Sequence, residues 1–276
     1  MQIRHQCSPK ETASMNTKEL RNNFLVENIF EADQINLLYS HYDRVITGGF
    51  LPLEKTLSLP NPENLKANFF LERRELGIIN VGGKGIIEVN GQRYELEKQD
   101  CIYIGKGIKD VKLKSASALN PALLFMISSP AHQAYPTQMM KIQKSTPVPL
   151  GAQETANQRT IYKYIHPEGI QSCQLVMGLT MLEKGSVWNT MPPHTHDRRM
   201  EVYFYYDIPE GQRVLHLMGE PEETRHIWMS NHEAVISPPW SIHSGCGTSN
   251  YSFIWAMAGE NQSFTDMDFV ETEQLR

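Results

Sequence analysis

Three histidines and one glutamate form the pattern with the clearest chemical meaning in this sequence. His194 and His196 are separated by a single residue, and Glu201 follows a short polar stretch. On a β-strand, residues i and i+2 share a face about 6.6 Å apart, so both imidazoles can reach one ion. A hairpin turn would then bring Glu201, at the start of the next strand, beside them.

His243 completes this set from a much later strand-like segment, ISPPWSIH. Three neutral imidazoles and one carboxylate suit zinc, iron, nickel or manganese better than calcium, which prefers oxygen ligands. The sequence therefore predicts a transition-metal site whose ligands lie far apart along the chain. The competing interpretation is a group of core or solvated histidines beside an ion-paired glutamate.

The composition is that of a folded protein and limits the classes of partner. The 276 residues are 40% hydrophobic and 21% charged, which argues against extended disorder, collagen and coiled coil. A net charge of -5 disfavours nucleic-acid binding. The sequence contains no apolar stretch of the roughly 20 residues that a bilayer requires and no signal-peptide core. We therefore expect a cytoplasmic protein with a small-molecule ligand and no nucleic-acid or membrane partner.

The elements that must position the four ligands are mostly short strands. Residues 17–30 have the apolar spacing of an amphipathic helix, with Thr17 as a possible N-cap. The apolar runs after it are brief and rich in β-branched and aromatic residues, and Asn90-Gly91 is a typical two-residue hairpin turn. Repeated short strands with Gly, Pro and Asn between them indicate an all-β fold.

The chain also shows signs of an internal duplication. A polar connection at residues 141–160 separates two series of strands, which places a domain boundary near residue 150 and gives domains 1–150 and 151–276. Glu72-Arg73-Arg74 opens a strand in the first series much as Asp197-Arg198-Arg199 opens one in the second. We interpret the two series as copies of one small β-barrel.

The metal pattern resembles that of the cupin superfamily. His194-x-His196-x4-Glu201, together with His243 preceded by Pro238, is similar to the two metal-binding motifs of cupins. The first half resembles a degenerate cupin barrel, because it has no His-x-His and Asp110 takes the place of His243.

A closer resemblance, to the 5-keto-4-deoxyuronate isomerase family, covers essentially the whole chain. It implies a bicupin fold of two tandem jelly-roll barrels with a short N-terminal helix, a homohexamer, and one zinc ion per subunit. It also implies that zinc is bound by His194, His196, Glu201 and His243. The resemblance is carried by the stretches LRNNFLVENIF, YSHYDRVITGG, FFLERRELGIINVGGKG, WNTMPPHTHDRRMEVYFYY, ETRHIWM, ISPPWSIHSG and FIWAMAGENQSFTDMD.

The activity implied by this resemblance is an aldose-ketose isomerisation in pectin and uronate breakdown. The substrate would be 5-keto-4-deoxyuronate (4-deoxy-L-threo-5-hexosulose uronate) and the product 3-deoxy-D-glycero-2,5-hexodiulosonate. Moving the carbonyl from C1 to C2 requires transfer of a hydrogen from C2 to C1, for which we favour proton transfer through an enediolate over a hydride shift. A metal ion can act as a Lewis acid where negative charge develops.

Other residues are candidates for the remaining tasks. The substrate carboxylate needs a cation, for which Arg198, Arg199 and Arg225 are candidates, although arginines in turns are often solvated or paired with acids. Tyr203 and Tyr205 share strand parity with Glu201 and are candidate proton-transfer groups, with a core role as the alternative. Glu75 and a zinc-bound water are further candidates for the base.

Two other functions are compatible with the same four ligands. A cupin with this donor set could be an iron-dependent dioxygenase, and a cupin without turnover could be a sugar-binding module. A dioxygenase would consume oxygen, whereas a binding module would bind a uronate without converting it.

Overall fold

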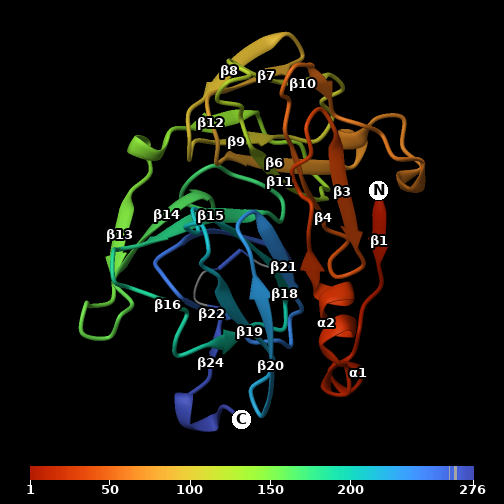
Figure 1. Ribbon diagram of the computed structural model, residues 1–276. Coiled ribbons are helices and arrows are strands. Elements are labelled where there is room, and N and C mark those ends of the chain that lie inside the picture. The colour runs from red at the N-terminus through yellow and green to blue at the C-terminus, as the bar shows by residue number, and fades with distance from the viewer. Residues whose placement is uncertain (261, 264–265) are drawn as a thin grey trace. The chain divides into compact units, whose positions relative to one another are not determined.

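The computed structural model describes residues 1–260, 262–263 and 266–276 (Figure 1). It consists mainly of β-strands with a few short helices, as the sequence predicts. Residues 261, 264 and 265, which fall within the last of the resembling stretches, lie outside the described residues. None of the helices that the structure describes is long and apolar enough to cross a membrane.

The chain forms two compact units whose segments alternate along the sequence. The first unit contains residues 1–4, 28–146 and 163–177, and the second contains residues 5–27, 147–162 and 178–276. A division into contiguous domains at residue 150 stays a prediction.

The first unit is built from a larger and a smaller sheet. The larger sheet has the order β1 (Gln2–Arg4), β3 (Ile35–Ser40), β4 (Ile46–Phe50), β11 (Leu124–Pro130), β6 (Arg74–Asn80), β9 (Cys101–Ile104) and β12 (Gln138–Met140). The smaller sheet has the order β5 (Leu57–Ser58), β10 (Val111–Ser115), β7 (Gly85–Val89) and β8 (Gln92–Leu96). Short 3-10 turns span Glu63–Leu65, Phe70–Glu72 and Ile142–Lys144. Asn90 and Gly91 join β7 to β8 with φ angles of 47° and 84°, which confirms the predicted hairpin.

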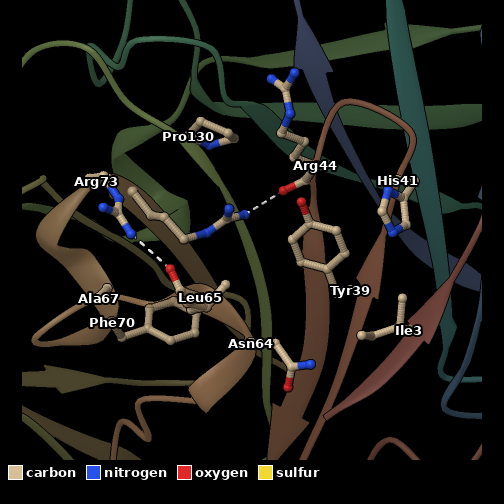
Figure 2. Close-up of a pocket in the computed structure, with 11 residues that line it drawn as sticks. Ile3, Tyr39, His41, Arg44, Asn64, Leu65, Ala67, Phe70, Arg73 and Pro130 are labelled. Carbon is tan, nitrogen blue, oxygen red and sulfur yellow. Dashed lines mark hydrogen bonds between the residues drawn. The ribbon is translucent and has the colours of Figure 1, made fainter.

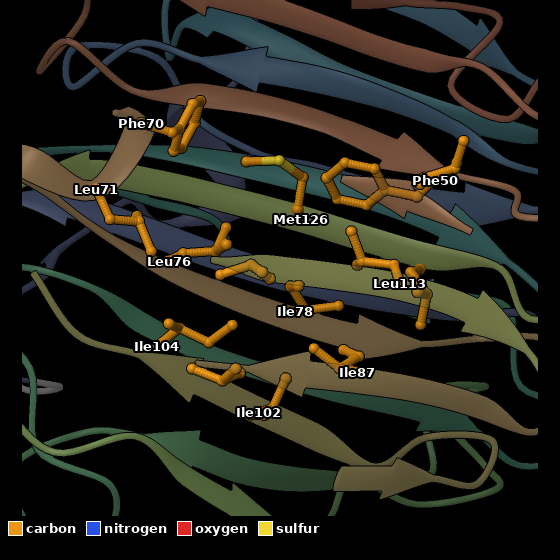
Figure 3. Close-up of a cluster of buried hydrophobic side chains, with 14 of the residues drawn as sticks. Phe50, Phe70, Leu71, Leu76, Ile78, Ile87, Ile102, Ile104, Leu113 and Met126 are labelled. Atoms are coloured by element: carbon orange, nitrogen blue, oxygen red, sulfur yellow. The ribbon is translucent and has the colours of Figure 1, made fainter. Parts of the chain in front are cut away.

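The core of this unit lies between its two sheets. Figure 3 shows Ile78 and Ile102 of the larger sheet in one cluster with Ile87 and Leu113 of the smaller sheet. These four side chains are 0% exposed. Alternation along each strand turns one set of side chains inward, so apolar residues at every second position of both sheets fill the barrel.

The second unit repeats this plan. Its larger sheet has the order β13 (Pro147–Leu150), β14 (Arg159–Ile165), β15 (Val176–Leu182), β23 (Ser252–Gly259), β18 (Arg199–Tyr206), β21 (Glu233–Ser237) and β2 (Leu25–Val26). Its smaller sheet has the order β16 (Trp188–Asn189), β22 (Ser244–Gly247), β19 (Val214–Glu220) and β20 (Glu223–Met229). β17 (His194–Thr195) pairs with β24 (Asp268–Phe269), and a 3-10 turn spans Thr272–Gln274.

The matching strand orders support the internal duplication. β6 lies between β11 and β9 in the first unit, as β18 lies between β23 and β21 in the second. Arg74 and Arg199, which the sequence pattern aligns, are the first residues of these two strands. Both arginines are buried, at 6% and 1% exposed.

The N-terminal helix is shorter than the sequence pattern suggests. α2 spans Thr17–Phe24, and its N-cap is Asn16 rather than Thr17. The Asn16 side chain accepts a hydrogen bond from the Glu19 amide, and the Glu19 carboxylate accepts one from the Asn16 amide. The helix ends at Phe24 because the next two residues pair with β21 as β2. A further helix, α1 (Pro9–Ala13), precedes it.

Glu75 of β6 is a buried anchor of the first unit. Its carboxylate accepts hydrogen bonds from the amides of Cys173, Gln174 and Leu175, at 2.7 to 3.0 Å. The hydroxyls of Tyr103 and Ser129 donate two more, at 2.8 and 3.1 Å. Proximity to Glu75 and burial both raise the pKa of Tyr103, burial being the larger cause, which keeps this donor protonated. The carboxylate therefore ties the loop at residues 173–175 to β6.

We expect Glu75→Gln to destabilise the protein by about 2 to 4 kcal/mol, because an amide nitrogen would face donors that need an acceptor. The midpoint of urea unfolding should fall, while the exposed control Glu54→Gln should match the wild type. An unchanged midpoint combined with loss of catalytic activity would instead make Glu75 a catalytic group.

Candidate metal centre

The structure brings His194, His196, Glu201 and His243 together in the second unit. Their ligand atoms all lie within 4.8 Å of one another. Nε2 of His243 lies 3.0 Å from Nε2 of His194 and 3.1 Å from Oε2 of Glu201, and Nε2 of His196 lies 3.2 Å from the same oxygen. His196, Glu201 and His243 are buried, and His194 is half-buried.

Strand pairing fixes where these side chains stand. Glu201 lies in β18, opposite Ser237 of β21 and Met257 of β23, so its backbone is held from both sides. β17 carries His194 and is held by β24. His243 immediately precedes β22. The aligned sheets thus deliver donors from three separate segments of the chain to one point.

Backbone carbonyls set the protonation pattern of two imidazoles. Nδ1 of His196 donates to the carbonyl of Arg199 at 2.9 Å, and Nδ1 of His243 lies 3.3 Å from the carbonyl of Ser241. A carbonyl can only accept, so in each neutral ring the hydrogen sits on Nδ1 and the lone pair on Nε2. Both lone pairs then point toward other acceptors, Oε2 of Glu201 among them.

This arrangement fits a bound cation. Atoms that each lie about 2.1 Å from one ion are separated from their neighbours by roughly 3.0 to 3.4 Å, close to the separations found here. The lone pairs of the four atoms repel one another, and a cation placed among them attracts all four. The four residues could therefore hold a metal ion, and the nitrogen-rich donor set suits a transition metal.

The electrostatics keep the donors in the form that a metal requires. Burial alone would raise the pKa of Glu201, but His243 and His196 hold it well below its ordinary value, so the carboxylate is ionised. Burial, reinforced by repulsion from His243, lowers the pKa of His194 to about 2. His194 is thus neutral and free to donate its lone pair near neutral pH.

The two tyrosines proposed from the sequence lie beside this centre. The ring of Tyr203 is 5.4 Å from that of His243, and its hydroxyl is 3.2 Å from Oγ1 of Thr190. The hydroxyl of Tyr205 is 2.8 Å from Nδ1 of His216. Burial raises the pKa of both tyrosines far above the ordinary value, so both hydroxyls keep their protons.

The three arginines proposed as substrate ligands have partners elsewhere in the second unit. Arg198 is exposed and pairs with Glu260 at 3.2 Å. Arg199 is buried, and its Nη1 donates to the carbonyl of Ser263 at 2.7 Å. Arg225 pairs with Glu223 at 2.7 Å and also donates to the carbonyl of Ala13.

Sequence patterns did not single out three polar residues of the same barrel. Nε2 of His216, the hydroxyl of Tyr251 and Nε of Arg159 are buried and have no hydrogen-bond partner within the described part of the chain. Burial lowers the pKa of Arg159, and the nearby Tyr203 and Tyr251 act in the opposite direction. The alternation in β19, where Val214, His216 and Met218 are buried, is the signal that could have placed His216 inside.

The sequence profile of the KduI/IolB family matches residues 24–272. The chain belongs to this family. It is 52% identical to 4-deoxy-L-threo-5-hexosulose-uronate ketol-isomerase of Halalkalibacterium halodurans and 54% identical to that of Lachnoclostridium phytofermentans, with 100% of each chain covered.

Solved structures extend the likeness at the level of the fold. An IolB-like protein from Salmonella typhimurium matches with a TM-score of 0.74 and 15% identity, covering 90% of this chain and 97% of the other. The oxalate decarboxylase of Lactobacillus farciminis matches with a TM-score of 0.56 and 8% identity, over 82% and 79% of the two chains. The KduI/IolB chain thus has the all-β cupin fold predicted from its sequence.

The buried His216 predicts a specific dependence of stability on pH. Burial lowers its pKa to about 3, below the roughly 6.5 of an unfolded chain, so the unfolded state takes up a proton first as the pH falls. Its contribution is complete above about pH 6.5 and shrinks by about 2 kcal/mol by pH 5. In metal-free protein, His216→Asn should therefore weaken the loss of stability between pH 7.5 and pH 5, measured by urea unfolding.

The matched control for this prediction is His226→Asn, since His226 is exposed on the neighbouring strand β20. It should leave the pH dependence unchanged. Equal pH dependence in the wild type and His216→Asn would contradict a neutral, buried His216.

Proposed function

We propose that this chain is a zinc-dependent ketol-isomerase that converts 4-deoxy-L-threo-5-hexosulose uronate into 3-deoxy-D-glycero-2,5-hexodiulosonate in pectin and uronate breakdown. The observation that carries the proposal is 52% to 54% identity, over the whole chain, to relatives with this named activity. The cluster of His194, His196, Glu201 and His243 supports it by supplying a site for the metal that such chemistry uses.

The metal would act at the oxygens of the reacting carbons. When bound, a divalent cation supplies Lewis-acid polarisation of the carbonyl and hydroxyl oxygens and stabilises the negative charge that develops on them. The chain itself binds and orients the cation through three nitrogens and one oxygen. The hydrogen bonds of His196 and His243 to backbone carbonyls keep those two rings in the required orientation.

Tyr203, Tyr205 and His216 are suited to hold protons beside the substrate. Because burial keeps the Tyr205 hydroxyl protonated, we assign it as the donor to Nδ1 of His216. Neutral His216 then carries its hydrogen on Nε2, which is free to donate to a substrate oxygen. Burial likewise raises the pKa of Tyr203, so its hydroxyl stays protonated and can donate a hydrogen bond to a substrate oxygen.

Arg159 is our candidate for the cation that binds the substrate carboxylate. It contributes a buried Nε without a partner among the described residues, while its Nη1 donates to the carbonyl of Asn157 at 2.9 Å. Arg198, Arg199 and Arg225, the candidates from the sequence, are already engaged by the partners described above. A substrate carboxylate could accept two hydrogen bonds from the Arg159 guanidinium and balance its positive charge.

We expect Arg159→Lys to raise the KM for the uronate by about tenfold with a smaller effect on kcat, because lysine cannot form the bidentate pair. Steady-state isomerisation kinetics measure both constants. Arg198→Lys is the control and should change neither, since Arg198 is exposed and paired with Glu260. A raised KM in Arg198→Lys together with an unchanged KM in Arg159→Lys would instead assign the substrate carboxylate to Arg198.

Metal analysis combined with an isomerisation assay tests the function itself. The purified protein should contain about one zinc ion per chain and should convert the product of an unsaturated-uronate lyase. His243→Ala should lose both the metal and the activity. Full activity after chelation would remove the metal from the mechanism, and oxygen consumption that requires ferrous iron would favour a dioxygenase. Uronate binding without conversion would favour a sugar-binding module.

Assembly and location complete the proposal. The resemblance described in the sequence analysis supports a homohexamer with one zinc ion per subunit. The same resemblance supports a cytoplasmic location.

A further inference from the structure

A pocket of about 440 Å³ lies in the first unit (Figure 2). All of its lining residues belong to this unit, whereas the four metal-binding candidates belong to the second. Its volume lies in the range of small-molecule sites. The lining residues are Ile3, Tyr39, His41, Arg44, Asn64, Leu65, Ala67, Phe70, Arg73, Arg74 and Pro130.

Arg74 gives this pocket a buried positive charge. It is 6% exposed, and its guanidinium donates to Oγ and the carbonyl of Ser128 and to the carbonyl of Arg44, at 2.6 to 3.1 Å. All three acceptors are neutral. The next residue, Glu75, attracts Arg74 electrostatically, but it forms no ion pair with it and instead accepts hydrogen bonds from five other donors. Burying a charge without an ionic partner is costly, so an anion in the pocket would stabilise Arg74.

Arg73 places a second cation at the rim of the same pocket. Its Nη2 donates to the carbonyls of Leu65 and Lys66 at 2.7 and 2.9 Å, which holds the side chain against the adjacent turn (Figure 2). The neighbouring Glu72 is turned to Asn68, which donates two hydrogen bonds to its carboxylate. No acidic residue is among those that the structure shows lining the pocket.

The rest of the lining suits a small polar molecule with an apolar face. Phe70 and Leu65 offer apolar surface, and Tyr39 and Asn64 offer hydrogen-bonding groups. Such a mixture of convergent polar groups and apolar walls is typical of ligand sites.

The duplicated barrel uses the corresponding arginine differently. Nη1 of Arg199 donates to the carbonyl of Ser263, so this guanidinium is engaged by the chain's own backbone. Arg74 instead lines the pocket of the first unit.

We propose that this pocket, which we call the arginine pocket, binds a small organic oxyanion: a carboxylate or phosphate on a molecule of sugar size. Arg73 and Arg74 bind the anionic group, and Tyr39 and Asn64 bind the hydroxyls of the same molecule. The site is independent of the metal centre and takes no part in the isomerisation.

Isothermal titration calorimetry of the zinc-loaded, full-length protein at low salt tests this proposal with inorganic phosphate and D-galacturonate as probes. D-galactose is the neutral control. We expect at least one of the two anions to bind and galactose not to bind. Binding of phosphate alone identifies a phosphate site, and binding of galacturonate alone identifies a carboxylate site. Arg73→Gln and Arg74→Met should each weaken binding by about tenfold or more.

Three controls separate the arginine pocket from other sites. Arg93→Gln changes an exposed arginine of the same unit that pairs with Glu95, and it should bind as the wild type does. Binding should persist in His243→Ala, which disrupts the metal centre. Isomerase activity should be unchanged in Arg73→Gln, whose exposed side chain also makes it the variant that folds if Arg74→Met does not.

The following results would overturn the proposal: no binding of either anion, equal binding by the wild type and Arg73→Gln, or loss of binding in His243→Ala. Sedimentation analysis covers one more outcome. If the anions do not bind but Arg73→Gln changes the mass of the assembly, the pocket is a contact between copies of the chain and not a ligand site.

Discussion

The second unit depends on a local conflict between acceptor atoms. Nε2 atoms of His196 and His243 carry lone pairs because their Nδ1 hydrogens are directed to backbone carbonyls, yet both atoms lie about 3 Å from an oxygen of Glu201. A cation bound among these atoms removes the conflict. β18 is buried and paired on both sides, which holds Glu201 in place, whereas His196 and His243 lie just outside β17 and β22.

The two units share this framework but have different interiors. When Arg74 is aligned with Arg199, Leu76 and Ile78 of β6 occupy the positions of Glu201 and Tyr203 of β18. In the first unit these inward positions therefore contribute to an apolar core, and in the second they face the metal centre. Strand order is the same in both units because the hydrogen-bonded framework does not depend on which side chains point inward.

The sequence predicted the parts of this protein that depend on local spacing. The all-β class and the Asn90-Gly91 hairpin follow from strand alternation and turn chemistry, and the structure agrees with both. The four donors do lie together, but the expected hairpin between His196 and Glu201 was wrong, because β17 ends at Thr195 and pairs with β24 instead of β18. The end of α2 at Phe24 could not be predicted, because it is set by pairing of β2 with a strand some 210 residues away. Arg159 and His216 were missed since their neighbours come from other strands, whereas Arg198, Arg199 and Arg225 find partners that no spacing rule indicates.

The position of the metal relative to the four donors tests the account most directly. Crystals of the protein purified with its native metal should be measured on both sides of the zinc absorption edge. We predict one anomalous peak in the second unit, about 2.0 to 2.2 Å from a nitrogen of His194, His196 and His243 and from an oxygen of Glu201. A fully occupied metal bound by other residues, or well-ordered donors without any anomalous peak in active protein, would contradict the account.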